Sequence, residues 1–431
     1  MLRRILLCLI LLLSPTLAGE ISAASPLRAG ISVVEITPPV GTPLGGFERP
    51  RLAAKVHDSL FAKILVLKTP ETSVALVSSD LHRLQSPALV NRIRDELGIA
   101  HTILLSSQTR AAPSLDPETR LSDWGKEVES RILRQVKQAQ DHLFSAKILF
   151  GQGALMGAHN IRVFQDDGSV QDRWGNPKEE GTAPIDPAVR VIRIDQEGAG
   201  PKAILVHYSC EPAVLGTRNQ EISADFPGSM SRYVEGQFGR NVASFFLAGA
   251  SANIYPFKPG LHGPDGFAEV DKMGQRLGRE AVRVARSLGP RDWENQLRAG
   301  EQVHTFKNRW DPSRKIDVTI GTVFLNSGLA LVAVPGSLFL EFQLLLNAKS
   351  PVTALLLSGG FSGSSSWAGI IPPIIQAAEG GFGASYATDI EVGSGEAIVD
   401  QAAIGLYRFL GKLEDLPRGI LVNEIPDLVS P

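Results

Sequence analysis

Cysteine is scarce in this 431-residue sequence, which contains only Cys8 and Cys210. Cys8 lies in an N-terminal segment that we expect to be removed on export. Cys210 would then remain alone in an oxidising compartment, where no intramolecular disulfide could form. A single cysteine can serve as a nucleophile, but Cys210 closely follows the apolar run Ala203 to Val206 and is predicted to be a buried, inert thiol.

The sequence also lacks an excess of one charge, because it contains 43 Lys and Arg residues and 45 Asp and Glu residues, for a formal net charge of -2. Nucleic-acid binding needs a basic face, and no block of Lys and Arg is present, so no nucleic-acid partner is predicted. The 43% of apolar and 20% of charged residues are typical of a soluble globular domain.

An apolar run, Ile5 to Leu13, lies near the N-terminus of the sequence. It is shorter than a membrane span, because a span needs roughly 20 residues. Pro15 interrupts it, two arginines precede it and small residues follow it, which is the pattern of a secretory signal peptide. We therefore expect residues 1–24 to be a cleaved signal and the mature chain to begin near Ser25. The protein would be secreted or periplasmic, with no permanent membrane span.

Short β-rich runs alternate with segments of helical spacing along the rest of the chain. Strands are expected at Ile31 to Val34, Phe61 to Leu67, Val74 to Ser78, Ile103 to Leu105, Lys147 to Phe150, Val189 to Ile194, Ala203 to Tyr208, Ala243 to Leu247, Val318 to Leu325 and Leu329 to Val334. Helices are expected at Ser86 to Leu97, Trp124 to His142, Gly228 to Gln237, Phe267 to Ser287 and Ala397 to Leu410. This alternation predicts a single α/β layered domain.

The predicted domain occupies residues 25–414 and is followed by a short tail, 415–431. The sequence shows no internal repeat. Two polar segments rich in Gly and Pro, 158–184 and 361–383, are predicted to be long surface loops, and loops of that length often border functional sites.

Seven short motifs follow one another along the chain. They are Ala29 to Pro43, His57 to Lys63, Leu76 to Leu81, Asp186 to Val191, Ser223 to Gly228, Phe246 to Ala250 and Val334 to Gly336. In this order they resemble the neutral/alkaline non-lysosomal ceramidase family, over a stretch from about Arg28 to Leu410. The resemblance implies the family's α/β catalytic fold, here without its immunoglobulin-like C-terminal domain. It also implies a relation to enzymes that hydrolyse the amide bond of ceramide with a zinc-activated water.

The positions at which that family holds zinc carry other residues in this sequence. The family's Thr-His-Thr-His-Ser-Gly-Pro stretch corresponds to Ser107 to Pro113, where Gln108 and Arg110 replace the two histidines. Glu211 replaces the histidine of a Cys-His-Pro turn, and Ser337 replaces the glutamate of a Pro-Gly-Glu turn. An amide is a poor zinc ligand, and a guanidinium has no lone pair to offer. The comparison therefore predicts that no zinc cofactor is bound.

Other family positions are also changed. The tyrosine ligand aligns loosely with Ser364 to Ile370, where Trp367 is the large aromatic residue. The serine that follows Gly-Asp-Val in the family aligns with Tyr255, and the aspartate before it with Asn253. Asp225 stands ahead of a predicted helix, so we expect it to cap the helix N-terminus, with a role in the pocket as the alternative.

The substitutions share one physical pattern, since a cation site has lost its metal and gained an arginine. We expect Arg110 and Glu211 to form a bidentate ion pair in place of the metal, with Gln108, Asn253 and Ser337 nearby. A separation of more than about 6 Å would contradict this pairing. The alternative is that Arg110 points to solvent.

A hydrolytic triad is a competing interpretation of other polar residues. His57 with Asp58, or Asp80 with His82, would have to act with a serine such as Ser79 or Ser106. No Gly-x-Ser-x-Gly motif occurs near these residues, so this interpretation is disfavoured. His159 aligns beside the substrate pocket of the family and is predicted to be a loop residue.

Three hypotheses for function remain. The first is a non-catalytic or altered homologue that binds a small amphipathic or N-acyl ligand. The second is an active hydrolase with a rebuilt site, in which Glu211 is a general base or a ligand to calcium or magnesium. The third is a scaffold without a ligand. The degenerate catalytic positions are Glu211, Arg110 and Tyr255, and the expected ligand contacts are Gln108, Asn253, Ser337, Asp225 and Trp367.

Overall fold

The computed structural model describes residues 26–46, 51–117, 119–239, 241–289, 296–363 and 365–413. The predicted signal peptide and the predicted tail lie outside these ranges. Cys210 is a free, buried cysteine, and burial raises the pKa of its thiol well above the ordinary value, as expected of an inert thiol. None of the described helices is both long and apolar enough to cross a membrane.

The two largest sheets of the described residues are both mixed, one of eight strands and one of four. The strand order is β17-β15-β14-β10-β1-β5-β6-β8 in the large sheet and β19-β20-β21-β23 in the small one. The predicted α/β class is therefore confirmed.

The main elements come in three successive units of the same topology. Each unit has three antiparallel strands, a helix, a fourth strand parallel to the third, and a closing helix. The first unit contains β1 (Arg28–Glu35), β5 (Phe61–Lys68), β6 (Ser73–Ser79), α1 (Pro87–Leu97), β8 (His101–Ser106) and α2 (Asp123–Asp141). The sequence shows no repeat, but the topology repeats.

The second and third units follow the same order. The second contains β10 (Phe144–Ala154), β14 (Ala188–Gln196), β15 (Gly200–Tyr208), α3 (Asp225–Phe238), β17 (Ala243–Ala248) and α4 (Gly263–Ser287). The third contains β19 (Arg298–Lys307), β20 (Lys315–Asn326), β21 (Leu329–Val334), α5 (Glu341–Lys349), β23 (Thr353–Ser358) and α7 (Ser394–Phe409). Units one and two share the large sheet through an antiparallel contact between β1 and β10, and unit three forms the small sheet.

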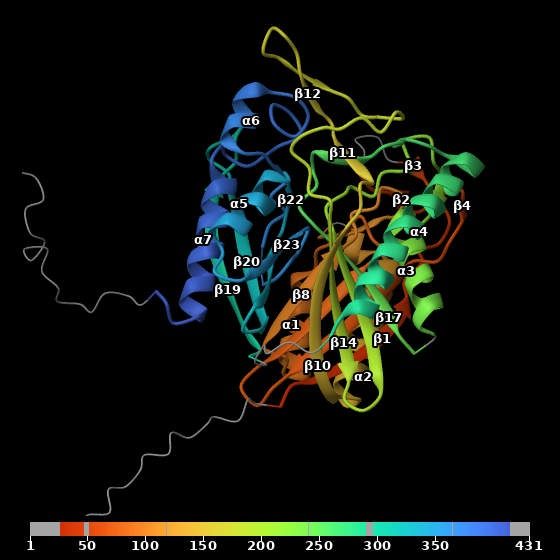
Figure 1. Ribbon diagram of the computed structural model, residues 1–431, viewed down its shortest axis with the longest axis vertical. Helices are drawn as coiled ribbons and strands as arrows, with labels where there is room; N and C mark the ends of the chain where they lie inside the picture. The colour runs from red at the N-terminus through yellow and green to blue at the C-terminus, as the bar shows by residue number, and fades with distance from the viewer. Residues whose placement is uncertain are drawn as a thin grey trace, which may run out of the picture.

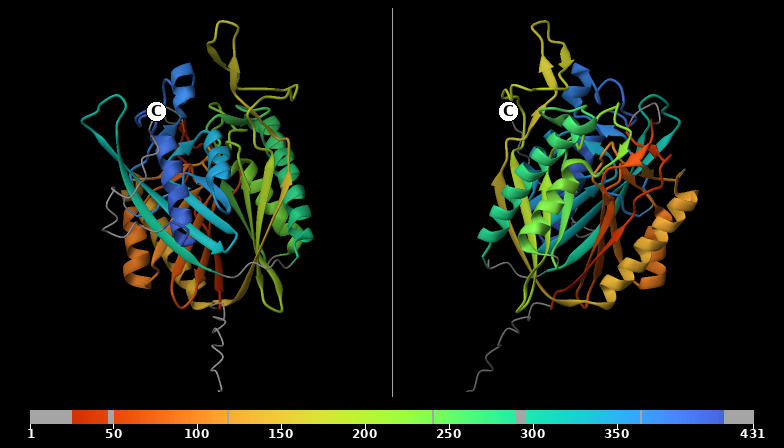
Figure 2. Two further views of the ribbon diagram at one scale, coloured as in Figure 1. Left: turned by 60° about the vertical axis from the view of Figure 1, so that its left-hand side comes forward. Right: turned by 90° about the vertical axis from the view of Figure 1, so that its right-hand side faces the viewer.

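Alternation along the strands produces a stack of four layers, which can be followed in Figures 1 and 2. Successive residues of a strand point to opposite faces of a sheet. Ile64 and Val66 of β5 therefore face the helices α1 and α2, whereas Leu65 and Leu67 pack with residues of the small sheet. Helices α3 and α4 cover the rest of the large sheet on that side, and α5 and α7 cover the outer face of the small sheet.

Helix ends follow local signals in the sequence. In α1 the Ser86 hydroxyl accepts a hydrogen bond from the N–H of Leu89, Pro87 occupies the first turn, and Gly98 ends the helix in the left-handed conformation at φ 66°. In α2 the Ser122 hydroxyl caps the N-terminus in the same way, accepting from the N–H of Gly125.

Short strands gather at the end of the molecule that is uppermost in Figure 1. They are β2 (Pro43–Leu44), β3 (Arg51–Leu52), β4 (Lys55–Val56), β7 (Arg83–Leu84), β9 (Ser114–Leu115), β11 (Ala158–Asn160), β12 (Arg162–Phe164), β13 (Val170–Asp172), β16 (Glu221–Ile222), β18 (Ile254–Pro256), β22 (Ser337–Leu338) and β24 (Ile370–Ile371). The hairpin β12–β13 projects beyond the body there, and the short helix α6 (Ile374–Glu379) lies at the same end.

The two predicted surface loops are only partly loops. The segment 158–184 begins with the buried strand β11, which pairs with β18, and continues into the β12–β13 hairpin. His159 lies in β11 and is fully buried, with Nε2 at 3.0 Å from the carbonyl oxygen of Arg173, so its assignment to a loop was wrong. The segment 361–383 contains β24 and α6.

Candidate functional site

A cavity of about 910 Å³ lies beyond the ends of the parallel strand pairs. Each unit contributes one such pair, β6 with β8, β15 with β17, and β21 with β23. Parallel strands end at the same edge of a sheet, so the residues that follow them are brought together. Gln108 follows β8, Glu211 follows β15 and Ser337 follows β21, and all three side chains line the cavity.

Arg110 and Glu211 lie side by side in this cavity. Arg110 Nη2 is 4.0 Å from Glu211 Oε2, inside the 6 Å limit set from the sequence. The pair is not bidentate as expected, because 4.0 Å is longer than a hydrogen bond. The same nitrogen donates a hydrogen bond to the Tyr255 hydroxyl. The Ser251 hydroxyl donates to the other carboxylate oxygen of Glu211 at 3.1 Å. The Arg110 side chain is only 16% exposed, which contradicts the alternative that it points to solvent.

Burial controls the ionisation of Glu211. Its removal from water raises the pKa of this carboxyl above the ordinary 4.5, although the positive charge of Arg110 and the hydrogen bond from Ser251 act in the opposite direction. The desolvation of the carboxylate is therefore only partly offset by its neighbours.

Gln108 is held in an unusual backbone conformation by its neighbours. Its φ is 66°, in the left-handed region that residues other than glycine rarely adopt, and its N–H donates to the carbonyl oxygen of Leu81 at 3.1 Å. The Ser337 hydroxyl donates to Gln108 Oε1 at 2.6 Å. Among the described residues Gln108 Nε2 has no hydrogen-bond partner, although it is buried. Strain and an unmet donor thus coincide at the cavity wall.

Asn253 and Asp225 were expected to contact a ligand, but neither lines the cavity. Asn253 fixes the start of α5, since Oδ1 accepts from the Leu340 N–H at 2.9 Å and Nδ2 donates to Glu341 at 3.0 Å. Through these buried contacts Asn253 stabilises the start of α5 behind the cavity wall and does not contact the cavity itself.

Asp225 is the first residue of α3 and not its cap, which is Ala224. The predicted capping role is therefore corrected. The Asp225 carboxylate accepts hydrogen bonds from the N–H groups of Leu215 at 3.0 Å and Phe226 at 2.6 Å. Burial raises the pKa of this carboxyl to about 7.

Several residues that line the cavity were missed by the sequence analysis. His82 was considered only as a triad member, and Arg83 was not considered, although both follow the end of a predicted strand. Burial and the positive charges of Arg83 and Arg110 lower the pKa of His82 to about 3, so it is neutral at pH 7. The aromatic residues Trp174 and Phe382 come from the two segments predicted as loops, where only their length pointed to function.

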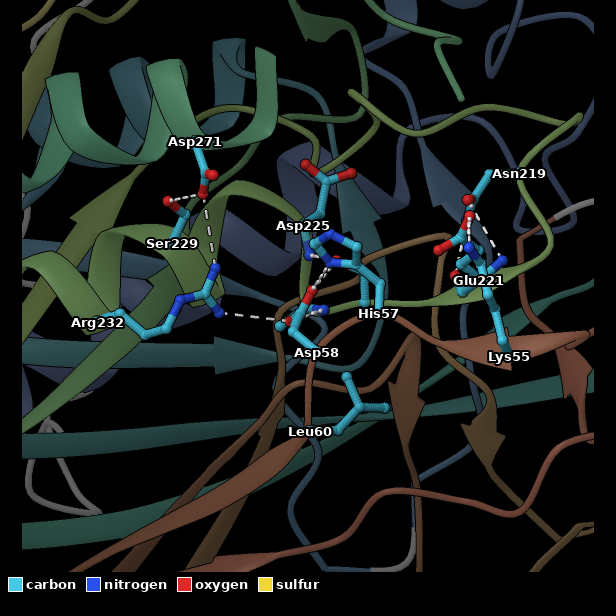
Figure 3. A network of polar contacts seen from close by, with 12 residues as sticks. Lys55, His57, Asp58, Leu60, Asn219, Glu221, Asp225, Ser229, Arg232 and Asp271 are labelled. Carbon is cyan, nitrogen blue, oxygen red and sulfur yellow. Dashed lines mark hydrogen bonds and ion pairs between the residues drawn. The ribbon is translucent and has the colours of Figure 1, made fainter. Parts of the chain in front are cut away.

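The competing triad is contradicted by the geometry around Asp58, shown in Figure 3. Asp58 Oδ2 is bound both by His57 Nδ1, at 3.0 Å, and by the Ser223 hydroxyl, at 2.6 Å. A triad needs the serine to contact the histidine, whereas here both contact the carboxylate. The Ala224 N–H donates to Asp58 Oδ1 at 3.0 Å, and Arg232 lies 3.5 Å from the same oxygen. This network joins the start of α3 to the segment before β5.

The second proposed triad is also contradicted. Asp80 lines a separate groove beside α3, whereas His82 lines the cavity, so the two side chains do not meet. The Ser79 hydroxyl donates to the carbonyl oxygen of Leu105 at 2.9 Å. Ser106 Oγ is buried and has no hydrogen-bond partner among the described residues.

The side chains in the cavity do not fit a zinc ion. Within the described ranges, no three His, Cys, Asp or Glu side chains come close enough together to hold a metal. The carboxylates of Glu211 and Asp389 and the imidazole of His82 line the cavity, and the guanidinium of Arg110 lies beside Glu211. The fixed positive charge of that guanidinium repels a cation, calcium and magnesium included.

The solved structures that are similar to this one include two ceramidases. The crystal structure of neutral ceramidase from Pseudomonas aeruginosa matches with a TM-score of 0.72 and 14% sequence identity, over 91% of this chain and 76% of that chain. This chain has the fold of the neutral ceramidases. A ceramidase complexed with C2 gives a TM-score of 0.71 and 13% identity, over 90% and 76% of the two chains. No protein-family model matches the sequence, and no curated protein matches it.

Proposed function

We propose that this chain is an exported ceramidase-like protein in which Arg110 and Glu211 stand where the neutral ceramidases hold zinc. It binds a small amphipathic or N-acyl ligand and does not hydrolyse it. The observation that carries the proposal is the position of Arg110 in the cavity, 4.0 Å from Glu211. A guanidinium supplies positive charge but cannot activate water as a bound metal does. The site therefore needs no metal cofactor.

The size and lining of the cavity support a ligand that is partly apolar. Its volume of about 910 Å³ is within the range of pockets that hold small molecules. Aromatic side chains make up part of the wall, and Trp174 contacts Tyr255 and Phe382 edge to face, with ring centroids 5.2 and 5.0 Å apart. A scaffold without a ligand would instead be expected to have a filled site.

Metal content and turnover test the proposal together. The purified protein should contain well under one zinc ion per chain by mass spectrometry, and it should leave N-dodecanoylsphingosine intact after overnight incubation. The same protein should bind this compound in a fluorescence competition assay. One tightly bound zinc per chain, together with amide hydrolysis, would reject the proposal.

A restored variant tests the assignment of the zinc positions. It carries Gln108→His, Arg110→His, Glu211→His and Ser337→Glu, and should bind one zinc ion per chain, because three imidazoles and a carboxylate then face one cavity. A variant with only the three histidine substitutions is the fallback if the fourth prevents folding. If a folded variant of this kind takes up no zinc, the assigned positions are wrong.

The second candidate function is an active hydrolase with Glu211 as general base. The raised pKa of Glu211 favours it, since catalytic carboxyls are often tuned upward by burial. Wild-type protein should then cleave short N-acyl substrates, and Glu211→Gln should lower turnover at least about 100-fold. A panel of N-acyl sphingosines and N-acyl amino acids with no turnover by the wild type removes this candidate.

A further inference from the structure

We infer that Arg83 binds the carboxylate of an anionic amphiphile, so that the preferred ligand carries a free carboxylate and not a neutral head group. The inference rests on the proposed function, because it assumes that the cavity holds an amphipathic ligand. It adds the chemical class of the head group and the residue that selects it.

Arg83 lies at the cavity wall as the first residue of β7. Its guanidinium carbon is 4.6 Å from the centre of the Trp367 ring, which also lines the cavity. Arg83 Nε is buried and has no hydrogen-bond partner, and no hydrogen bond or ion pair joins the guanidinium to any other described residue. The face of an indole ring is therefore its main contact.

Another arginine at this end of the molecule shows how such a group is usually satisfied. Arg162 Nη1 donates to the carbonyl oxygen of Gly380 at 2.6 Å, and Nη2 donates to Glu379 at 3.1 Å. A guanidinium carries five N–H donors, and leaving them unmet in a partly buried place is costly. Arg83 therefore has donors available for a partner that the protein does not supply.

The charges around Arg83 favour a carboxylate over a doubly charged phosphate. Asp116 and Asp389 act on Arg83 through space, yet neither forms an ion pair with it. Asp389 and Glu211 also line the cavity and would repel a dianion more strongly than a monoanion. A carboxylate, in contrast, matches the planar fork of a guanidinium through two parallel hydrogen bonds.

The apolar part of such a ligand has a surface to lie on in the same cavity. Trp174, Tyr255, Phe382 and Tyr386 all line it, and the rings of Phe382 and Tyr386 are 5.8 Å apart. A head group at Arg83 and a hydrocarbon chain along these rings would occupy one continuous cavity.

Calorimetric titration with N-dodecanoylglycine, its methyl ester and dodecyl phosphate tests the inference. The wild type should bind the acid at least about 10-fold more tightly than the ester, and Arg83→Gln should weaken binding of the acid about 10- to 100-fold. Binding of the ester should stay within about twofold of wild type, since it offers no charge to Arg83.

Arg286→Gln is the matched control, because Arg286 also lies over an aromatic ring, that of Phe238, and does not line the cavity. It should leave all three affinities unchanged. If Arg83→Gln does not fold, Arg83→Lys keeps the charge without the fork and should show a smaller loss.

The possible outcomes separate this inference from the proposed function. Equal binding of acid and ester by the wild type, or unchanged binding of the acid by Arg83→Gln, overturns the inference alone. Tighter binding of dodecyl phosphate than of the acid overturns the choice of carboxylate. No binding of any of the three compounds overturns both the inference and the proposed function.

Discussion

Two polar clusters in this molecule satisfy their hydrogen-bonding groups in different ways. The Asp58 network consists of His57, Asp58, Ser223 and Arg232, and both oxygens of its central carboxylate accept bonds from protein donors. The cavity cluster consists of Gln108, Arg110, Glu211 and Ser337. It lines an open space, and Gln108 Nε2 stays unpartnered among the described residues.

The comparison shows that residue types alone do not identify a functional site. The Asp58 network has the composition of a hydrolytic triad, yet its bonds join a loop to a helix start. The cavity cluster does not have this composition, yet it lines a cavity and combines a strained backbone with an unpartnered donor. Substitutions in the Asp58 network should therefore change mainly the stability of the fold, and substitutions in the cavity cluster should change mainly ligand binding.

The largest expected effect on stability comes from Asp225, which is bonded to the network through Ser223. Burial raises the pKa of Asp225 to about 7 from an ordinary 3.8. Because the folded value is raised, its contribution to the free energy of unfolding is complete below about pH 4 and is lost as the pH rises through 7. At about 1.4 kcal/mol per pH unit between the two values, the loss is roughly 4 kcal/mol.

Asp225→Asn stays neutral, and asparagine tolerates the positive φ of 54° at this position. Because the amide nitrogen cannot accept, the variant keeps an acceptor for only one of the N–H groups of Leu215 and Phe226 and should be less stable than wild type by about 1 kcal/mol at pH 4. Its stability relative to wild type should rise by roughly 4 kcal/mol between pH 4 and pH 8, as urea unfolding would show. Asp225→Ala is the control, because it removes the bonds to Leu215 and Phe226 and should be less stable at both pH values. Parallel pH profiles for wild type and Asp225→Asn would contradict the prediction.

The second effect is the loss of the central carboxylate of the network. Asp58→Ala leaves the Ser223 hydroxyl and the Ala224 N–H without their acceptor, and should lower the free energy of unfolding by about 3 kcal/mol. Asp271→Ala removes a carboxylate that is 55% exposed and should cost less than about 1 kcal/mol. Equal losses for the two variants, measured by urea unfolding, would show that the network is no stronger than a surface contact.

The smallest effect is expected in the cavity cluster. Because burial raises the pKa of Glu211, ionising this carboxyl at high pH disfavours the folded state. Glu211→Gln should therefore be slightly more stable than wild type at pH 8, by no more than about 1 kcal/mol, and should show no gain at pH 4. A marked loss of stability at pH 8 would mean that the attraction of Arg110 outweighs burial. Differential scanning calorimetry at the two pH values measures the sign.

Much of the fold could be predicted because its strands and helices are long and strongly patterned. The run Phe61 to Leu67 and the helix from Trp124 match β5 and α2 closely. Strand β19 was missed because half of its residues are exposed and no apolar alternation marks it, and α5 because its nine residues are too few to show helical spacing clearly. The threefold topology was missed because the units share strand order and not sequence.

The site was predictable where a short motif fixed the residue. Gln108, Arg110, Glu211 and Ser337 were singled out because short segments resemble the zinc-ligand motifs of the ceramidase family, and they do line one cavity. Tyr255 was also found, but its hydrogen bond with Arg110 was not. The two residues are 145 positions apart in the sequence, so only the folded structure shows that the Arg110 guanidinium donates to the Tyr255 hydroxyl. The aromatic wall comes from segments that have no common pattern.

The bond between Ser337 and Gln108 joins residues 229 positions apart, in the third unit and the first. Contacts between such distant residues form only after the intervening chain has been ordered, since closing a long loop has an entropic cost. During synthesis the first unit is therefore complete long before the third unit, and the cavity cannot form until both are present. Ligand binding therefore requires that the third unit has folded onto the first, and a chain truncated before the third unit lacks the binding site.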